Sequence, residues 1–154
     1  MVLDGINLAI EPGQIVALVG SSGAGKSTVA SLLMRLYDPT AGRILIDGRD
    51  IRDYTLDSLR GQISVVLQDP LLFSDSMREN IALADPSASD AEIEAAARLA
   101  NAHDFIMATA EGYDTVLAER GVSLSAGQRQ RLTIARAALR RGRILILEIG
   151  RAHV

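Results

Sequence analysis

Apolar residues along the chain fall into short runs of strand length that alternate with segments of helical periodicity. Residues 14–19, 63–67 and 144–147 are mostly apolar, which is typical of strands buried on both faces of a parallel sheet. A shorter run at residues 43–47, closed by Asp47-Gly48, predicts a further strand, and residues 6–10 alternate weakly.

Helical patterns separate these predicted strands. Residues 27–37 place Val29 and several leucines on one face, which predicts an amphipathic helix. Three later helices are predicted to begin at a serine that is followed, at capping-box spacing, by Glu or Gln: Ser76 with Glu79, Ser89 with Glu92, and Ser125 with Gln128. We expect the second of these to reach residue 102 and the third residue 140, with Gly142 as the residue after the helix. Strands that alternate with helices predict an α/β domain with a largely parallel core sheet.

Composition narrows the class of protein. The 154 residues carry a formal net charge of −3, so no nucleic-acid partner is expected, because such binding needs a basic face. The chain has no cysteine, which excludes disulfides and thiolate metal sites. No apolar run reaches the ~18–20 residues needed to cross a bilayer. We therefore expect any membrane association to come through other chains or through parts of the protein outside this sequence.

The segment GSSGAGKS, residues 20–27, fits the P-loop pattern GxxxxGK[ST]. Glycines let the backbone N–H groups approach phosphate oxygens, and the following helix directs its positive end at the same anion. Lys26 is expected to contact the β- and γ-phosphates, and the Ser27 hydroxyl to bind Mg²⁺. A Gly/Ser linker could match the letters by accident, but here the segment stands between a predicted buried strand and an amphipathic helix. It therefore predicts nucleotide binding, without choosing among P-loop NTPases.

A second motif, LSAGQRQR at residues 124–131, resembles the LSGGQ signature of ABC ATPases. In that family the motif faces the P-loop of a second domain, so that ATP lies between two domains in a head-to-tail dimer. Ser125 stands at the N-cap position, where it offers a hydroxyl and helix-start N–H groups to an anion; the alternative is that it only caps a structural helix. Ala126 replaces a glycine of the motif, and we expect its methyl group to have a modest effect on ATP-driven dimer closure.

The resemblance covers nearly the whole chain. Gln68 follows a predicted strand and matches the Q-loop glutamine, which touches Mg²⁺ and the attacking water; the alternative is an ordinary loop amide. Residues 69–83 and 118–121 resemble the exporter branch of the family, in which the ATPase domain is usually fused behind transmembrane helices. The resemblance thus implies transmembrane domains and a second ATP-binding domain as partners, at the cytoplasmic face of the cell membrane.

The implied fold is that of a P-loop NTPase with a RecA-like, mainly parallel core sheet, an N-terminal antiparallel β portion and an α-helical signature subdomain over about residues 72–140. Residues 1–147 would form part of an ABC ATP-binding domain truncated at both ends. In the family core sheet, a strand later in the chain lies between the P-loop strand and the strand at residues 144–147. Because that strand would be lost with the C-terminal part of the core, we expect the isolated chain to be poorly folded or prone to aggregate.

Residues 143–147 resemble the start of Walker B, whose strand ends in Asp followed by a catalytic Glu. Glu148 stands at the Asp position, where a carboxylate could still hold the Mg²⁺ shell, although its longer side chain would misplace it. Ile149 replaces the general base. Residues 148–154 back-translate to GAGATCGGAAGAGCACACGTC, which after its first G resembles a sequencing adapter. The tail is therefore expected to be non-native; a diverged C-terminus is the alternative.

The resemblance implies Lys26 and Gln68 as catalytic residues, Ser27 and Gln68 as Mg²⁺ ligands, and ATP with Mg²⁺ as cofactors. The nucleotide contacts are expected from the P-loop, the Q-loop and the signature: Gly20, Ser21, Ser22, Gly23, Ala24, Gly25, Lys26, Ser27, Thr28, Gln68, Ser125, Ala126, Gly127 and Gln128.

The leading interpretation is the ATP-binding and hydrolysing domain of an ABC exporter, in which the intact parent is active and this piece alone is not. One alternative is a soluble ABC ATPase of DNA repair or translation, which would lack upstream membrane helices. The other is a catalytically silent nucleotide-binding module, which a native Ile149 would favour.

Overall fold

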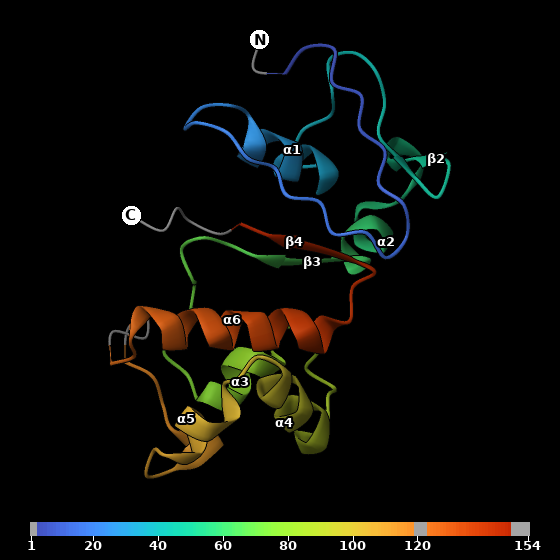
Figure 1. Ribbon diagram of the computed structural model, residues 1–154. Coiled ribbons are helices and arrows are strands. Elements are labelled where there is room, and N and C mark those ends of the chain that lie inside the picture. The colour runs from blue at the N-terminus through green and yellow to red at the C-terminus, as the bar shows by residue number, and fades with distance from the viewer. Residues whose placement is uncertain (1–2, 119–122, 149–154) are drawn as a thin grey trace. The chain divides into compact units, whose positions relative to one another are not determined.

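The computed structural model of the protein describes residues 3–118 and 123–148. By backbone contacts the chain divides into two compact units, Met1–Arg60 and Gly61–Val154. The first unit contains these elements (Figure 1): α1 (Lys26–Leu33), β1 (Leu45–Ile46), β2 (Arg49–Asp50), the single 3₁₀ turn η1 (Ile51–Asp53) and α2 (Leu56–Gly61), whose last residue begins the second unit.

The strand predicted at residues 14–19 is wrong, because this segment has no regular secondary structure. Its apolar side chains are exposed rather than buried on both faces: Ile15 is 99% exposed and Val19 is 89% exposed. A strand exists only when a neighbouring strand takes up its ladder hydrogen bonds, and none of the described residues does so here. Residues 6–10 likewise form no strand.

The Asp47-Gly48 turn is confirmed. β1 and β2 pair antiparallel, with Leu45 opposite Asp50 and Ile46 opposite Arg49. Asp47 and Gly48 between them both have positive φ, 50° and 78°, which a two-residue hairpin turn of this hand requires. The strand is shorter than the predicted residues 43–47, because pairing reaches only as far as its partner.

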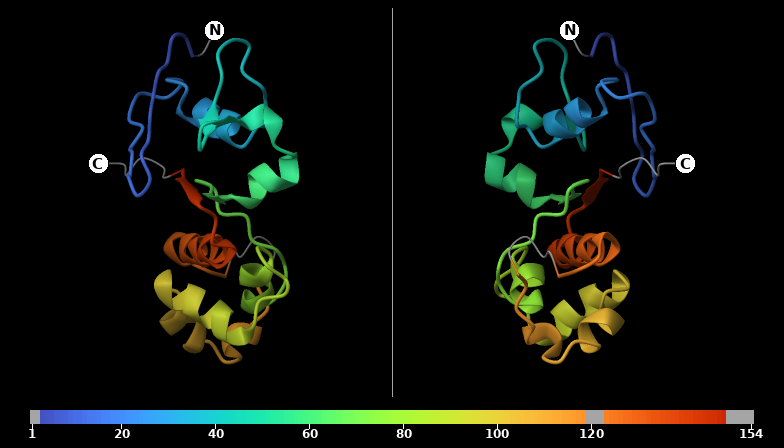
Figure 2. Two further views of the ribbon diagram at one scale, coloured as in Figure 1. Left: turned by 90° about the vertical axis from the view of Figure 1, so that its right-hand side faces the viewer. Right: turned by 90° about the vertical axis from the view of Figure 1, so that its left-hand side faces the viewer.

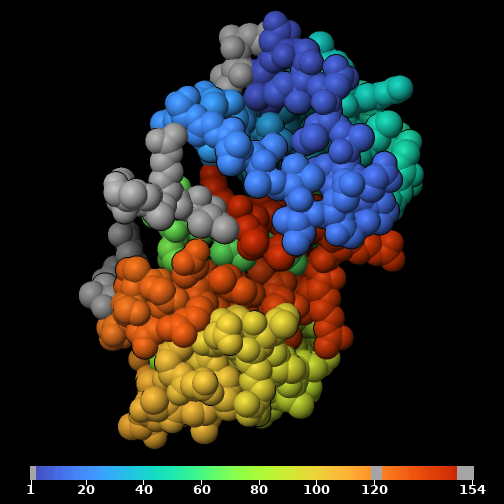
Figure 3. Space-filling view, in the orientation of Figure 1, coloured from blue at the N-terminus to red at the C-terminus, as the bar shows by residue number. Residues whose placement is uncertain are grey.

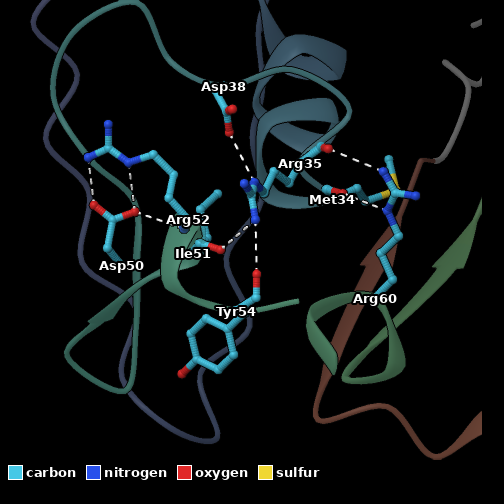
Figure 4. A network of polar contacts seen from close by, with 8 residues as sticks. All are labelled: Met34, Arg35, Asp38, Asp50, Ile51, Arg52, Tyr54 and Arg60. Carbon is cyan, nitrogen blue, oxygen red and sulfur yellow. Dashed lines mark hydrogen bonds and ion pairs between the residues drawn. The ribbon is translucent and has the colours of Figure 1, made fainter. Parts of the chain in front are cut away.

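The helix after the P-loop, α1, ends at Leu33, short of the predicted residue 37. Arg35 there adopts a left-handed φ of 50°, and its side chain enters a polar network (Figure 4). Its Nη1 donates to the carbonyl oxygens of Tyr54 at 3.0 Å and Ile51 at 3.3 Å, and its Nε pairs with Asp38 at 3.1 Å. Arg60 donates to the two carbonyl groups that follow α1, each at 3.2 Å. This network ties the end of α1 to η1 and α2.

The second unit contains these elements (Figure 1): β3 (Ile63–Val66), α3 (Met77–Ala82), α4 (Asp90–Leu99), α5 (His103–Met107), the 3₁₀ turn η2 (Gly112–Asp114), α6 (Ala126–Arg140) and β4 (Ile144–Leu147). β3 and β4 pair in parallel, from Ile63 with Ile144 to Val66 with Leu147, so the α/β class with parallel pairing is confirmed. The expectation that β4 is buried on both faces is wrong, because Leu145 and Leu147 are 57% and 48% exposed.

Helix α6 lies between the β3–β4 pair on one side and α3, α4 and α5 on the other (Figure 1, Figure 2). On the face shown in Figure 3, the side chains of α4 and α5 (yellow) lie against those of α6 (orange). Their apolar faces form one buried cluster that includes Ile81, Ile106, Leu117 and Leu132, each at most 2% exposed. The members of this cluster run from Leu72 to Leu139, although the subdomain boundary at about residues 72–140 stays a prediction.

The predicted serine caps are confirmed for α3, α4 and α6, each of which begins directly after its serine. The helix predicted to run to residue 102 ends earlier, at Leu99, because Asn101 takes a left-handed φ of 53° and α5 starts anew.

The role predicted for Gly142 is wrong. Arg141 ends α6 in the left-handed conformation, with φ 52°, and Gly142 instead passes close to β3. A Cβ at Gly142 would lie 2.6 Å from Ser64 Oγ and 2.7 Å from Ser64 N, so glycine is needed for close approach rather than for its φ.

Across residues 3–118 and 123–148, every helix is too short or too polar to span a bilayer.

Candidate nucleotide-binding site

The P-loop of the first unit is shaped by its glycines. Gly23 and Gly25 have φ of 82° and 87°, a conformation that L side chains rarely adopt. Gly20 lies close to the other side of the loop, where an added Cβ would stand 3.1 Å from Ala24 Cβ. Ala24 N donates to Ser21 O at 3.2 Å and closes the turn. These conformations fold the segment into the tight loop expected from the pattern.

Lys26 lies across this loop. Its Nζ donates to the carbonyl oxygens of Gly20 and Ser21, both at 2.9 Å. Because Lys26 is also the first residue of α1, its ammonium group is held beside the positive end of the helix, where phosphate oxygens would bind.

The start of α1 fits an anion. Its N-cap, Gly25, has no side chain, so no side-chain cap takes up the first N–H groups of the helix. Ser27 and Thr28 follow in the first turn, Ser27 exposed and Thr28 half-buried. Backbone N–H groups, an ammonium and a hydroxyl form the set of groups that holds a triphosphate with its divalent cation. The residues present therefore fit ATP with Mg²⁺.

The signature motif of the second unit begins α6. Ser125 is the N-cap, its Oγ accepts from Gln128 N at 3.2 Å, and Gln128 Oε1 accepts from Ser125 N at 2.8 Å. Ser125, Ala126 and Gly127 are exposed. The structure thus shows a capping role for Ser125, while the hydroxyl hydrogen remains a donor that can reach a ligand. Gln128 is partly engaged, because its side-chain oxygen completes the capping box.

Gln68 and Glu148 lie at the same end of the β3–β4 pair. The parallel register continues past Val66 and Leu147, since Glu148 N donates to Val66 O at 2.8 Å. Gln68 is exposed directly after β3, and Glu148 is half-buried directly after β4. The carboxyl ends of parallel strands are where α/β sheets bind ligands.

The other Walker B expectations cannot be placed. Ile149 and the rest of the tail lie outside the described residues, as do residues 119–121 of the exporter-like segment. The non-native origin of residues 148–154 stays a prediction.

No group of three or more histidine or carboxylate side chains suited to a metal ion occurs in the described ranges 3–118 and 123–148. The roles of Ser27 and Gln68 as Mg²⁺ ligands stay predictions.

Sequence reasoning missed two polar residues of the second unit, Asn80 and Arg136. Asn80 is fully buried and Arg136 is half-buried, and together they bind the segment that follows Gln68. An arginine on an amphipathic helix resembles a solvent-facing residue, and its acceptors are mostly backbone carbonyl groups that every sequence has. No local pattern would have revealed the contact.

Comparison with known proteins gives a consistent picture. Residues 3–148 match the family model described as ABC transporter. The chain is 56% identical over 147 residues to a putative multidrug export ATP-binding/permease protein of Staphylococcus aureus strain NCTC 8325, and equally to its counterpart in strain COL. Each match covers 96% of this chain and 25% of the relative, so the chain spans a quarter of their length.

A similar solved structure is that of a bacterial Atm1-family ABC exporter with ATP bound. It aligns with a TM-score of 0.79 and 50% identity, over 82% of this chain and 22% of that chain.

Proposed function

The chain belongs to the ABC transporter family, and we propose that it is the domain that binds and hydrolyses ATP in a membrane exporter. One observation carries the proposal above the others: the Lys26 ammonium lies over the P-loop, beside a helix start that no side chain caps. The names of the relatives, which pair an ATP-binding part with a permease, support the exporter assignment.

The proposed reaction is transfer of the γ-phosphoryl group of ATP to water. Lys26 and the P-loop N–H groups would hold the phosphates and offset the negative charge that develops on them. Ser27 and Gln68 would orient Mg²⁺, which when bound neutralises charge on the β- and γ-phosphate oxygens. Gln68 would also align the attacking water. The general base has no assigned residue, because Ile149 occupies the position expected for it.

A second copy of the domain is the proposed partner at the signature. Ser125, Ala126 and Gly127 lie exposed at the start of α6, so they can face a ligand held by another chain. The helix start there offers a hydroxyl donor and a positive end to the γ-phosphate of that partner's ATP. We propose that ATP binds between two head-to-tail domains and that hydrolysis separates them.

We also propose that fused or associated transmembrane domains place this dimer at the cytoplasmic face of the membrane. The relatives are about four times longer than the matched stretch, which leaves room for such domains. Reading the gene on both sides of the region that encodes this chain tests this directly. Membrane-spanning segments upstream are expected; their absence would favour a soluble ABC ATPase.

ATP hydrolysis can be tested in a chimera, defined as the Staphylococcus aureus relative with its matching segment replaced by residues 3–147 of this chain. The relative then supplies every residue outside that segment. We expect the purified chimera to hydrolyse ATP and the Lys26→Ala variant to lose at least about a hundredfold in rate. Equal rates in the two proteins would rule out the proposed function.

A further inference from the structure

Arg136, in the C-terminal half of α6, binds residues far from it in sequence. Its Nε donates to the backbone oxygen of Asn80 at 2.8 Å, and its Nη1 donates to the backbone oxygen of Leu71 at 2.9 Å. Its Nη2 reaches Asn80 Oδ1 at 3.3 Å, and the guanidinium carbon lies 6.0 Å from the ring centre of Phe73. All these contacts are within the second unit, and Leu71 is in the loop that Gln68 begins.

Asn80, in α3, binds the same loop segment as Arg136. It is fully buried, and its Oδ1 accepts from Phe73 N at 2.9 Å while its Nδ2 donates to Phe73 O at 3.0 Å. The side-chain amide thus pairs with Phe73 as a neighbouring strand would. The same Nδ2 lies 3.0 Å from the backbone oxygen of Ser76. Residues 71–75 are therefore held by side chains from two helices, although they form no regular structure themselves.

The acceptors of Arg136 are neutral. They are two carbonyl oxygens and one amide oxygen, and burial lowers the pKa of Arg136 below its usual value. Removing a cation from water costs free energy, and no carboxylate among the described residues pairs with Arg136 to offset that cost. The contacts of Arg136 are therefore poorly explained by a contribution to stability. A planar guanidinium does, however, fix several acceptors in one geometry, which an ammonium cannot do.

We propose that Arg136 is a positioning residue for ATP hydrolysis. Through Leu71 and Asn80 it fixes the loop that Gln68 begins to the helix that Ser125 caps. The Q-loop glutamine and the signature serine are thereby held at a set spacing, so that a shift of one is passed to the other along a rigid helix. The inference rests on the proposed function, since this spacing matters only if the chain hydrolyses ATP.

The first test measures turnover per bound ATP in the chimera with Arg136→Lys. This substitution keeps the positive charge but removes the planar guanidinium that donates to several acceptors at once. We expect turnover per bound ATP to fall about tenfold, as for the loss of one hydrogen bond to a charged group, with the Kd for ATP within about twofold. The matched control is Arg98→Lys, because Arg98 is exposed and pairs with Glu94 on its own helix. A variant that merely folds less well would bind fewer ATP per chain at unchanged turnover per bound ATP. That outcome would overturn the proposal.

The second test measures the spacing itself. This chain has no cysteine, so spin labels can be attached at Asp69→Cys and Ser123→Cys, two exposed positions beside Gln68 and Ser125. In a cysteine-free chimera diluted with unlabelled protein, we expect a narrow distance distribution that broadens with Arg136→Lys and stays narrow with Arg98→Lys. Unchanged width, or broadening without loss of turnover, would overturn the positioning role.

The two proposals fail in different ways. Full turnover in the Arg136→Lys chimera removes only the positioning role. A chimera that is insensitive to Lys26→Ala removes the proposed function, and the positioning role with it.

Discussion

Ala126, the first residue of α6, places an exposed methyl group where the ABC signature has glycine. Alanine suits helical dihedrals, so the exchange is expected to change the surface offered to the γ-phosphate more than the helix. We predict that Ala126→Gly in the chimera changes the ATP hydrolysis rate by less than about threefold, equivalent to under 1 kcal/mol. Steady-state rates at saturating ATP provide the check, and a large gain would contradict this account.

Gly142 is a second position where the addition of a single Cβ atom is expected to have a measurable effect, here on stability. Ala at this site would bring Cβ within 2.7 Å of the backbone nitrogen of Ser64 and 3.0 Å of the Gln62 oxygen, and backbone atoms cannot move aside easily. We predict that Gly142→Ala costs about 2 kcal/mol and lowers the thermal inactivation midpoint of the chimera by roughly 4–8 °C.

Gly61→Ala is the matched control for Gly142→Ala, because a Cβ at Gly61 would meet nothing within 4 Å. It should change stability by no more than about 0.5 kcal/mol. Equal effects of the two substitutions would show that the close approach to β3 is absent.

Residue-level prediction succeeded where the chemistry is local. The P-loop letters specify backbone N–H groups, a lysine and a hydroxyl within a few residues, and the structure brings Lys26 onto its own loop. The role of Gly142 was misassigned because the clash depends on β3, which is distant in sequence. Arg136 was missed for the same reason, since its acceptors are backbone oxygens some 56 and 65 residues away.

At the level of elements, α4 and α6 begin with the same capping motif. Ser89 and Ser125 both form complete capping boxes, with Glu92 and Gln128. Ser89→Ala and Ser125→Ala should therefore each cost about 1 kcal/mol of stability. Only Ser125→Ala should lower ATP hydrolysis per bound ATP, by at least about tenfold, because only that hydroxyl is proposed to face phosphate.

Comparing Ser89→Ala with Ser125→Ala separates the loss of a helix cap from the loss of a catalytic contact. Thermal midpoints and turnover per bound ATP would be measured on both variants. Equal turnover would mean that Ser125 only caps its helix.

The helix starts were predictable because the capping-box pattern involves only four consecutive residues. The turn at Asp47-Gly48 was predictable for the same reason, whereas the short partner strand that follows it was not predicted from these residues. The strand at residues 14–19 was not, because an apolar run says only that burial is favourable. Whether a strand forms depends on another segment to bond with, and the described residues provide none there.

Over the whole molecule, large apolar side chains remain exposed in both units, among them Ile15 in the first and Leu145 in the second. Such surfaces promote association unless something covers them. We predict that the purified 154-residue chain aggregates or lacks a cooperative melt, whereas the same residues inside the chimera remain dispersed. Calorimetry and light scattering provide the check; a sharp, reversible transition of a monomer would contradict the prediction.

Retention of radiolabelled ATP by the chimera, with and without Lys26, tests whether the P-loop binds phosphate. We predict that the chimera retains ATP and that retention weakens about tenfold or more in Lys26→Ala, the loss expected for a charge-assisted contact to phosphate. Arg43→Ala, which removes an exposed cation from the same unit, should retain ATP as the parent does. No retained ATP, or retention that is unaffected by Lys26→Ala, would contradict the assignment of this loop as the phosphate-binding site.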